Sequence, residues 1–306
     1  MSDVAILGAG VIGASWASLF LAAGHRVRVH DPAPDAETAV RAYVDGAWPA
    51  LTRLGLAERG TPDEISFHAD PAEAVEGIAF AQESVPERVE IKHALYARIE
   101  DAFPANAVIA SSASGLTLTE MQAGWRDPRR LVLGHPFNPP HLVPLVEVMG
   151  NERTDADAVP AAEAIYEDAG KVTIRVEKEV PGHVANRLQA ALWREAIHLV
   201  LEGVASVKDV DTAIWAGPGQ RWAAMGPSTL FHLAAGAGGL EEYCRRYGPS
   251  FNRWWDDLGT PRMNEETARR LAEAVSEATE GADQATLAAQ RDALMIAMLE
   301  AQRDMR

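Results

Sequence analysis

The class of fold of this 306-residue chain is indicated most clearly by Val4-Ala5-Ile6-Leu7-Gly8-Ala9-Gly10-Val11-Ile12-Gly13. Four apolar residues, of the kind that is buried in a parallel sheet, lead directly into the glycine pattern G-x-G-x-x-G. Residues 14–23 are rich in Ala and Leu and predict a helix that Gly24 ends. A strand, a glycine turn and a helix in this order predict a dinucleotide-binding unit, because the glycine motif is informative only in that context.

Each glycine of this turn has a predicted part in holding a dinucleotide. Gly8 allows the tight turn, Gly10 lets the backbone approach a pyrophosphate, and Gly13 lets the helix pack closely on the strand. The N–H groups at the start of the helix, at Val11 and Ile12, are then expected to face the phosphates. A glycine-rich turn that binds nothing is the alternative.

An acidic residue after the second expected strand indicates which dinucleotide is bound. Asp31 directly follows residues 26–30, which form that strand. Its carboxylate is expected to accept hydrogen bonds from the adenosine ribose and to repel a 2′-phosphate, which favours NAD over NADP. FAD-binding proteins share the glycine pattern, so the pattern alone indicates a dinucleotide more firmly than a nicotinamide.

Strands and helices continue to alternate, which predicts βαβ units and a mostly parallel sheet. Pro49 is expected to kink or end the second helix. Ligands of such sheets bind beyond the carboxyl ends of the strands, so residues 83–87, residues 111–115 and His135 are expected to meet at one edge. The expected strands are residues 4–7, 26–30, 78–82, 107–110 and 172–176, and the expected helices are residues 14–23, 36–54, 89–99 and 158–169.

The alternation stops at Val180-Pro181-Gly182, where a second domain is expected to begin. We therefore predict an α/β Rossmann-type domain over residues 1–180 and an all-α domain over residues 181–306. Residues 184–201 carry two apolar stripes, as expected of a helix that is buried on two sides between domains or subunits.

A second stretch, Gly134-His135-Pro136-Phe137-Asn138-Pro139-Pro140, suggests a catalytic centre. Histidine can take up and return a proton near neutral pH, and a carboxylate such as Glu147 can fix its tautomer and stabilise the imidazolium. The prolines disfavour a helix, so two extended pieces, residues 131–133 and 145–148, joined by a stiff loop could bring the pair together. Taken alone, this spacing fits a surface loop with a structural histidine better.

Composition excludes several classes of function. The chain is 47% hydrophobic and 24% charged, as in ordinary globular proteins, and its net charge of -16 argues against a nucleic-acid or anionic-membrane surface. A single cysteine, Cys244, excludes an internal disulfide and suits a reducing cytoplasm. We find no signal-peptide pattern, no apolar run near the roughly 20 residues that span a bilayer, and no metal-ligand spacing among the nine histidines.

Six ordered motifs resemble those of the 3-hydroxyacyl-CoA dehydrogenase superfamily. They are residues 8–13 (GAGVIG), 82–87 (QESVPE), 110–116 (ASSASGL), 134–139 (GHPFNP), 144–148 (PLVEV) and 180–188 (VPGHVANRL). Within the superfamily, the chain most resembles the branch that holds L-carnitine dehydrogenase and lambda-crystallin, which is an L-gulonate 3-dehydrogenase. That resemblance lies in residues 48–51 (WPAL), 192–196 (LWREA) and 219–227 (GQRWAAMGP).

The resemblance implies a catalytic set. His135 corresponds to the catalytic base and Glu147 to its partner. Ser114 corresponds to the serine that hydrogen-bonds the reacting oxygen, and Asn186 to the asparagine that does so from the second domain. From the residues alone, the serines at 111 and 112 are better explained as turn or cap residues.

The resemblance also implies a cofactor end of the site and an assembly. Glu87 and Lys92 correspond to an acid and a lysine near the cofactor, with a solvated helix position as the alternative for Lys92. The family uses NAD and forms a homodimer through the helical domain, and we expect both here.

Charged and aromatic residues of the second domain bear on the substrate. Arg221, beside Trp222, follows a Gly-Pro-Gly turn, and its guanidinium suits bidentate capture of a carboxylate, with a surface or interface ion pair as the alternative. We therefore predict a free 3-hydroxy carboxylate. Trp193, Trp222, Trp254 and Trp255 could enclose a trimethylammonium group, although tryptophans at helical spacing are more often core. L-Carnitine and a sugar acid such as L-gulonate both remain candidates.

Other functions stay open. A 3-hydroxybutyryl-CoA dehydrogenase is disfavoured by the scarcity of bases in residues 35–63, where only Arg41, Arg53 and Arg59 are found. A non-catalytic, crystallin-like NAD-binding scaffold is disfavoured by the complete catalytic set. A β-hydroxyacid dehydrogenase of the other Rossmann-plus-helices type would need a lysine that residues 184–201 lack.

Overall fold

The computed structural model describes residues 2–303 as two compact units. The first unit holds the chain up to Ala185 and the short segment Met295–Glu300. The second unit holds Asn186–Leu294 and, of the described residues, also 301–303. No helix within residues 2–303 is long and apolar enough to cross a membrane.

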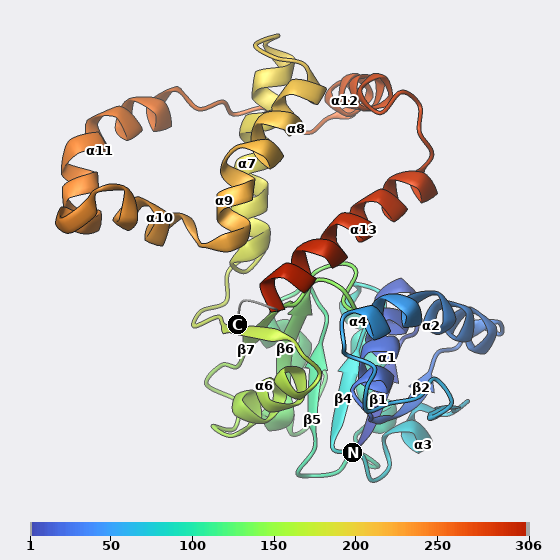
Figure 1. Ribbon diagram of the computed structural model, residues 1–306. Coiled ribbons are helices and arrows are strands. Elements are labelled where there is room, and N and C mark those ends of the chain that lie inside the picture. Colours follow the sequence, from blue (N-terminus) through green and yellow to red (C-terminus); the bar gives the residue numbers. More distant parts are fainter. Residues whose placement is uncertain (1, 304–306) are drawn as a thin grey trace. The chain divides into compact units, whose positions relative to one another are not determined.

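The first unit is built on one eight-stranded sheet with the strand order β3-β2-β1-β4-β5-β6-β7-β8 (Figure 1). All neighbouring strands are parallel except β6 and β7, which are antiparallel. The fold is therefore the predicted mostly parallel Rossmann-type sheet. The strands are β1 (Asp3–Leu7), β2 (Arg26–His30), β3 (Ile65–Phe67), β4 (Phe80–Glu83), β5 (Val108–Ser111), β6 (Leu131–Pro136), β7 (Leu145–Met149) and β8 (Val172–Arg175).

Helices cover both faces of this sheet, and the alternation of side chains along β1 shows why. Val4 and Ile6 point into one apolar layer with α1, α2 and α6, whereas Ala5 and Leu7 point into the other with α3, α4 and α5. All four are fully buried, which explains the uninterrupted apolar run. The helices are α1 (Val11–Ala22), α2 (Ala36–Arg53), α3 (Pro71–Val75), α4 (Val89–Ile99), α5 (Leu118–Gln122) and α6 (Ala158–Asp168).

The structure differs from the sequence-based expectations in a few places. Pro49 lies inside α2, which continues to Arg53, so the alternative in which Pro49 ends this helix is wrong. His135 lies within β6, which extends to Pro136, and not in a loop after it. The short elements β3, α3 and α5 were not predicted, because three to five residues are too few to show a period.

The second unit is entirely helical, as predicted. Within it, α7 buries only Ile197, while Leu188 and Trp193 are more than half exposed. The expected burial of α7 on two sides is therefore not met within the described chain. The helices are α7 (Ala185–Leu201), α8 (Val207–Ala216), α9 (Pro218–Ala224), α10 (Pro227–Ala234), α11 (Gly239–Asp257), α12 (Glu265–Ala278) and α13 (Gln284–Arg303), of which α7 and α13 also reach into the first unit.

Candidate active site

The glycine turn after β1 has the geometry that a pyrophosphate needs. Gly8 has φ +88°, a left-handed conformation that favours glycine, and a Cβ on Gly13 would lie 1.9 Å from the carbonyl oxygen of Gly8. A Cβ on Gly10 would meet nothing within 4 Å, so the space beside its backbone is open. Gly10 also caps α1 without any side-chain acceptor. The first-turn N–H groups, which include those of Val11 and Ile12, are left for an anion.

Asp31 lies next to this turn at the carboxyl end of β2. Its Oδ2 accepts a hydrogen bond of 2.7 Å from the N–H of Ala9, and its Oδ1 accepts one of 2.9 Å from the N–H of Ala33. Each carboxylate oxygen keeps a lone pair for a ribose hydroxyl. The turn, the uncapped helix and this acid together fit an NAD molecule, whose adenosine end they would hold.

The sheet pairs His135 and Glu147 directly. The two residues are opposite one another in the antiparallel ladder between β6 and β7, so their side chains leave the same face. His135 Nδ1 lies 2.7 Å from Glu147 Oε2, with His135 5% exposed and Glu147 fully buried. The expected approach of the two side chains is confirmed.

The carboxylate of Glu147 is held on both of its oxygens. Oε1 accepts hydrogen bonds of 2.9 Å from the N–H groups of Val184 and Ala185, where α7 begins. Burial alone would raise the pKa of Glu147, but the hydrogen bonds from His135, Ala185 and Val184 outweigh it and hold the pKa below its usual value. An ionised Glu147 accepts the proton on Nδ1 of His135, which leaves the lone pair of the imidazole on Nε2.

Two rings pack on the imidazole of His135. The ring of Phe137 has its centroid 5.5 Å away at 71°, and the ring of His183 lies 5.2 Å away at 53°. His183 is 3% exposed and has φ +48°. His183 was not predicted as a site residue, although its place three residues before Asn186 in the motif of residues 180–188 was a usable signal.

Glu87 shapes the loop that carries Ser114. Its Oε1 accepts hydrogen bonds from three successive N–H groups, at Ser114 (3.0 Å), Gly115 (2.7 Å) and Leu116 (3.0 Å). The loop directly follows β5, and Ser114 is exposed there. Glu87 therefore anchors the serine loop to the segment between β4 and α4.

Lys92 belongs to a buried network beneath that loop. It is 1% exposed, and its Nζ lies 2.8 Å and 2.9 Å from the two oxygens of the fully buried Glu83. Tyr96 and Ser111 donate to the same carboxylate, and Nζ is 3.9 Å from Glu87 Oε2. The alternative of a solvated Lys92 is wrong. Its ammonium neutralises a buried acid. Ser111 takes part in this network, which was not predicted, and its Oγ also accepts a hydrogen bond of 3.3 Å from the N–H of Ala113, as expected of a turn residue.

Polar side chains under the β6–β7 connection form hydrogen bonds that were not predicted from the sequence. Ser15 of α1 accepts a hydrogen bond from the N–H of His141 (2.9 Å) and pairs with its Nδ1 (2.8 Å). Lys171 donates to the carbonyl oxygens of Pro140 (2.6 Å) and Val143. The bonds of Ser15 connect the loop after His135 to the helix of the glycine turn, and those of Lys171 connect it to the segment between α6 and β8. No short-range sequence pattern predicts them.

The second unit carries the remaining predicted residues. Asn186 follows Ala185 in the first turn of α7, and Arg221 and Trp222 lie on α9. No hydrogen bond or ion pair is recorded for the Arg221 side chain among residues 2–303, so the ion-pair alternative finds no partner there. Asn186 and Arg221 are thus placed on their elements, and their roles remain predictions.

The tryptophans of this unit are not core residues. Trp193 is 56% exposed, Trp222 39%, Trp254 56% and Trp255 64%. The recorded ring contacts join Trp254 and Trp255 to Phe251, in an aromatic cluster of α10 and α11. Trp193 and Trp222 have no recorded ring contact within the described residues, so no box of four tryptophans is formed in this unit.

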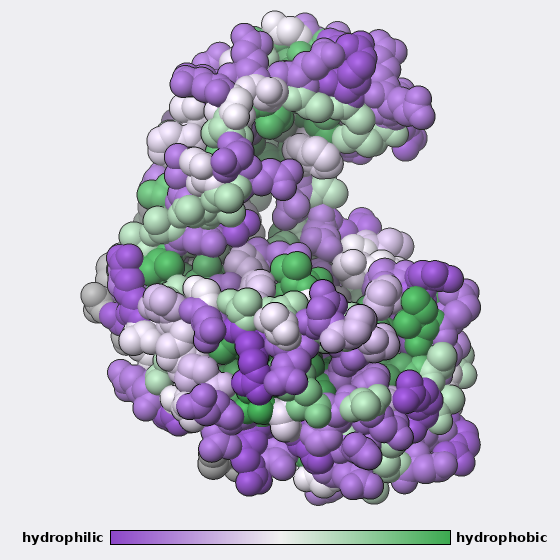
Figure 2. All heavy atoms as spheres, turned by 90° about the vertical axis from the view of Figure 1, so that its right-hand side faces the viewer, coloured by the Kyte–Doolittle hydropathy of each residue, from purple (hydrophilic) through white to green (hydrophobic). Residues whose placement is uncertain are grey.

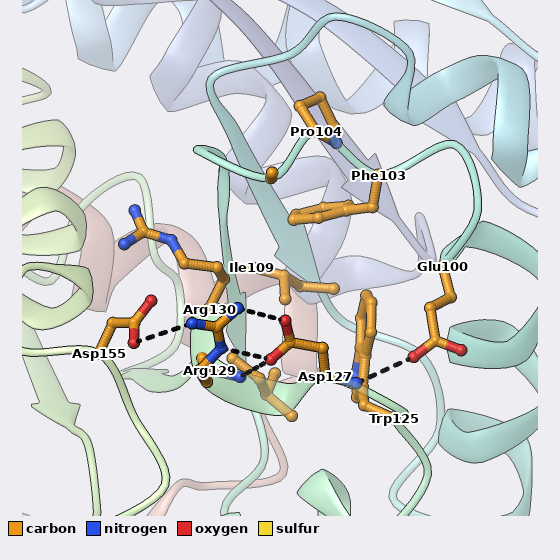
Figure 3. A pocket seen from close by; sticks show the side chains of 11 residues that line it. Glu100, Phe103, Pro104, Ile109, Trp125, Asp127, Arg129, Arg130 and Asp155 are labelled. Carbon is orange, nitrogen blue, oxygen red and sulfur yellow. Dashed lines mark hydrogen bonds and ion pairs between the residues drawn. The ribbon is translucent and has the colours of Figure 1, made fainter.

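A pocket in the first unit lies beside the starts of β5 and β6, at the opposite end of β6 from His135. Phe103 and Trp125 line it together with Arg129 and Arg130 (Figure 3). Arg129 pairs with Asp127 at 2.6 Å, and Arg130 pairs with Asp157 at 2.7 Å. The cations are therefore already neutralised, and the pocket offers a ligand little charge.

Comparison with known proteins identifies the family. The NAD binding domain of 3-hydroxyacyl-CoA dehydrogenase matches residues 3–180, and the C-terminal domain of the same enzyme matches residues 182–280. The chain belongs to the 3-hydroxyacyl-CoA dehydrogenase family. This family member is accordingly an NAD-dependent oxidoreductase that acts on a CH–OH group, in agreement with the turn and the acid described above.

Three similar relatives are named L-carnitine dehydrogenase. The chain is 49% identical over 298 residues to an L-carnitine dehydrogenase of Streptomyces coelicolor, covering 97% of this chain and 94% of the relative. It is 44% identical to one of Pseudomonas aeruginosa, over 98% of this chain and 94% of the relative. It is 40% identical to one of Bacillus cereus, over 98% and 92%.

Solved structures show the same architecture. The chain matches the 5-dehydrogenase of 5-formyl-3-hydroxy-2-methylpyridine 4-carboxylic acid, an NAD+-dependent dismutase, with a TM-score of 0.82 and 30% identity over 98% of this chain and 99% of that one. It matches 3-hydroxybutyryl-CoA dehydrogenase from Escherichia coli K12 with a TM-score of 0.63 and 26% identity, over 82% of this chain and 53% of that one.

Proposed function

We propose that this family member oxidises the 3-hydroxyl of a small free 3-hydroxy carboxylic acid, with L-carnitine as the first candidate, and that His135 is the general base. The observation that carries the proposal is the His135–Glu147 pair, 2.7 Å apart and anchored on Val184 and Ala185. A structural histidine would not need a fully buried carboxylate with both oxygens engaged.

The tautomer of His135 supports its role as a base. Because Nδ1–H donates to Glu147, Nε2 keeps a lone pair that can receive the proton of the substrate hydroxyl. Glu147 then stabilises the positive charge that His135 acquires. NAD, when bound, supplies the hydride acceptor. A positioned general base of this kind accelerates a reaction by roughly 10²–10⁴-fold.

Two further side chains are proposed to hold the reacting oxygen. Ser114, exposed on the loop that Glu87 fixes, can donate its hydroxyl proton to that oxygen. Asn186, next to Ala185, can donate its amide N–H. Both donors strengthen their hydrogen bonds as the oxygen gains negative charge, so they favour proton transfer to His135.

Contributions to NAD binding are proposed for two groups of residues. Direct contacts are assigned to the glycine turn with the N–H groups of Val11 and Ile12, and to Asp31 at the ribose. Glu87 and Lys92 are assigned indirect parts, because one holds the serine loop and the other neutralises Glu83 under it.

The charges of the chain favour a free acid over a CoA ester. The three bases between residues 35 and 63 are occupied, since Arg41 pairs with Glu37, Arg53 with Glu300 and Arg59 with Asp168. Arg221 has no recorded partner within residues 2–303, and its guanidinium suits a carboxylate. Trp222, exposed on the same helix, can face a trimethylammonium group. The name of the curated relatives adds weight to L-carnitine over L-gulonate.

A substrate panel tests the proposal. NADH formation is followed by absorbance with L-carnitine, L-gulonate, 3-hydroxybutyrate and 3-hydroxybutyryl-CoA. We expect the highest kcat/KM with L-carnitine and little turnover of the CoA ester. A preference for the CoA ester would overturn the assignment of a free acid.

The proposed contact between Arg221 and the substrate carboxylate is tested with a separate variant. Arg221→Met should raise KM for the acid by about tenfold or more, since a charge-assisted bidentate contact is lost. Arg269→Met is a matched control, because Arg269 pairs with Glu273 on α12 of the same unit. An unchanged KM in the Arg221 variant would show that Arg221 does not bind the substrate carboxylate.

A homodimer formed through the helical unit is also proposed. Leu188, Trp193 and Trp215 of this unit are 68%, 56% and 61% exposed. Figure 2 shows hydrophobic surface among the hydrophilic surface on the face of the molecule that it draws. Sedimentation equilibrium should give twice the mass of the chain. A monomer at working concentration would contradict this.

A further inference from the structure

His183 is placed beside the catalytic histidine at a conformational cost. Its φ of +48° is in the left-handed region, which a side chain with a Cβ rarely adopts. The turn follows Gly182, and the next two N–H groups, at Val184 and Ala185, bind Glu147. The backbone of His183 is therefore fixed by the same carboxylate that braces His135.

The ring of His183 carries a buried acceptor without a donor. Nε2 lies 3.4 Å from the carbonyl oxygen of Ala113, which can only accept, so the ring proton is on Nε2. Nδ1 then holds a lone pair, and it has no hydrogen-bond partner within residues 2–303. With the side chain 3% exposed, bulk water does not satisfy it either. Such an orphan costs stability, and a phenylalanine would fill the space without that cost.

The neighbour that changes charge during the reaction is His135. The two ring centroids are 5.2 Å apart, and Phe137, which also packs on His135, offers no acceptor. When His135 takes the substrate proton, its imidazolium is a cation whose ring centroid lies 5.2 Å from that of His183. The neutral ring of His183, with its unshared lone pair on Nδ1, can interact favourably with that cation.

We propose that neutral His183 is a positioning residue that stabilises the His135 imidazolium through the lone pair of Nδ1 and so makes His135 a stronger base. This inference rests on the proposed role of His135. The charged groups that face the pair within the first unit are Glu147 from β7 and Glu87 from the segment after β4. Burial lowers the pKa of His183, and His135 lowers it further, so His183 stays neutral while His135 accepts the proton.

The test compares two substitutions of different chemistry. His183→Phe keeps a ring but removes the acceptor. His183→Asn keeps an acceptor, since its Oδ1 is positioned much like Nδ1, and asparagine tolerates the left-handed backbone. The pKa of His135 is measured by NMR on the full-length protein with labelled histidine, and its signal is assigned by its absence in His135→Gln.

We expect His183→Phe to lower the pKa of His135 by about one unit, and His183→Asn to keep it near the wild-type value. The acid limb of kcat/KM should move in the same direction. An unchanged or raised pKa in His183→Phe overturns the proposal, as does an equal fall in both variants, which would indicate packing alone.

Two further readouts keep the test decisive. If His183→Phe does not fold, the wild-type titration answers alone, because protonation of His183 before His135 contradicts the proposal. Wild-type turnover in His135→Gln would show that His135 is not the general base and would contradict the proposed function. The NMR titration of the wild-type protein would still report whether the imidazoles of His135 and His183 interact.

Discussion

Substituting Glu147 by glutamine changes one atom of the site and should disable the base. The carboxylate accepts three hydrogen bonds, two at Oε1 from Val184 and Ala185 and one at Oε2 from His135. In Glu147→Gln the amide oxygen can satisfy Val184 and Ala185, which turns the amide nitrogen toward His135. The opposite orientation would set that nitrogen against two N–H donors, so it is disfavoured.

The favoured orientation reverses the tautomer of His135. An amide nitrogen only donates, so Nδ1 must accept and the ring proton moves to Nε2, where the substrate proton should arrive. The variant also lacks the negative charge that stabilises the imidazolium. We expect kcat to fall by about 10²–10⁴-fold, or roughly 3–5 kcal/mol in the barrier.

The assay is steady-state NADH formation with saturating NAD and L-carnitine, together with NADH binding by fluorescence and thermal unfolding. Glu163→Gln serves as the control, because Glu163 also pairs with a cation, Arg175, but on α6 away from the site. NADH should bind both variants as it binds the wild type. A folded Glu147→Gln enzyme with kcat within about tenfold of the wild type would show that Glu147 does not set the tautomer and charge of the base.

Three other predictions follow from the same structure. Gly13→Ala should abolish NADH binding or folding, because the added Cβ would lie 1.9 Å from the backbone oxygen of Gly8. Gly10→Ala should fold and lose only affinity for NADH, because its Cβ would meet nothing within 4 Å. Equal NADH binding by the two variants in a titration would contradict this. Lys92→Met should lower the free energy of unfolding by about 3–5 kcal/mol, because it leaves Glu83 as an unpaired buried charge. Adding Glu83→Gln to this variant should restore much of the lost stability. Urea unfolding that shows no such rescue would contradict the prediction. Burial lowers the pKa of Lys171 from 10.5 to about 7, so between these pH values the unfolded chain holds a proton that the folded chain has lost. The free energy of unfolding of the wild type should therefore rise with pH across this range relative to that of Lys171→Met. Parallel pH profiles of the two proteins would disprove this prediction.

Much of the fold was predictable because its signals are local. The strand, glycine turn and helix at residues 4–23 follow from neighbouring residues, and so do β2 and α4, whose predicted bounds agree with the structure. The continuation of α2 past Pro49 was not predictable, because it depends on packing of that helix.

The class of fold, the dinucleotide turn and the candidate pair of His135 and Glu147 could all be predicted from the amino-acid sequence. Three features became known from the folded chain: the pair lies cross-strand, Val184 and Ala185 complete the carboxylate's partners, and Lys92 is buried on Glu83. The folded chain also showed His183 beside His135. The physical reason is range: periodicity and glycine conformation act over a few residues, whereas hydrogen bonds between residues that are 9 to 38 positions apart, such as these, form only when the sheet brings their strands and loops together.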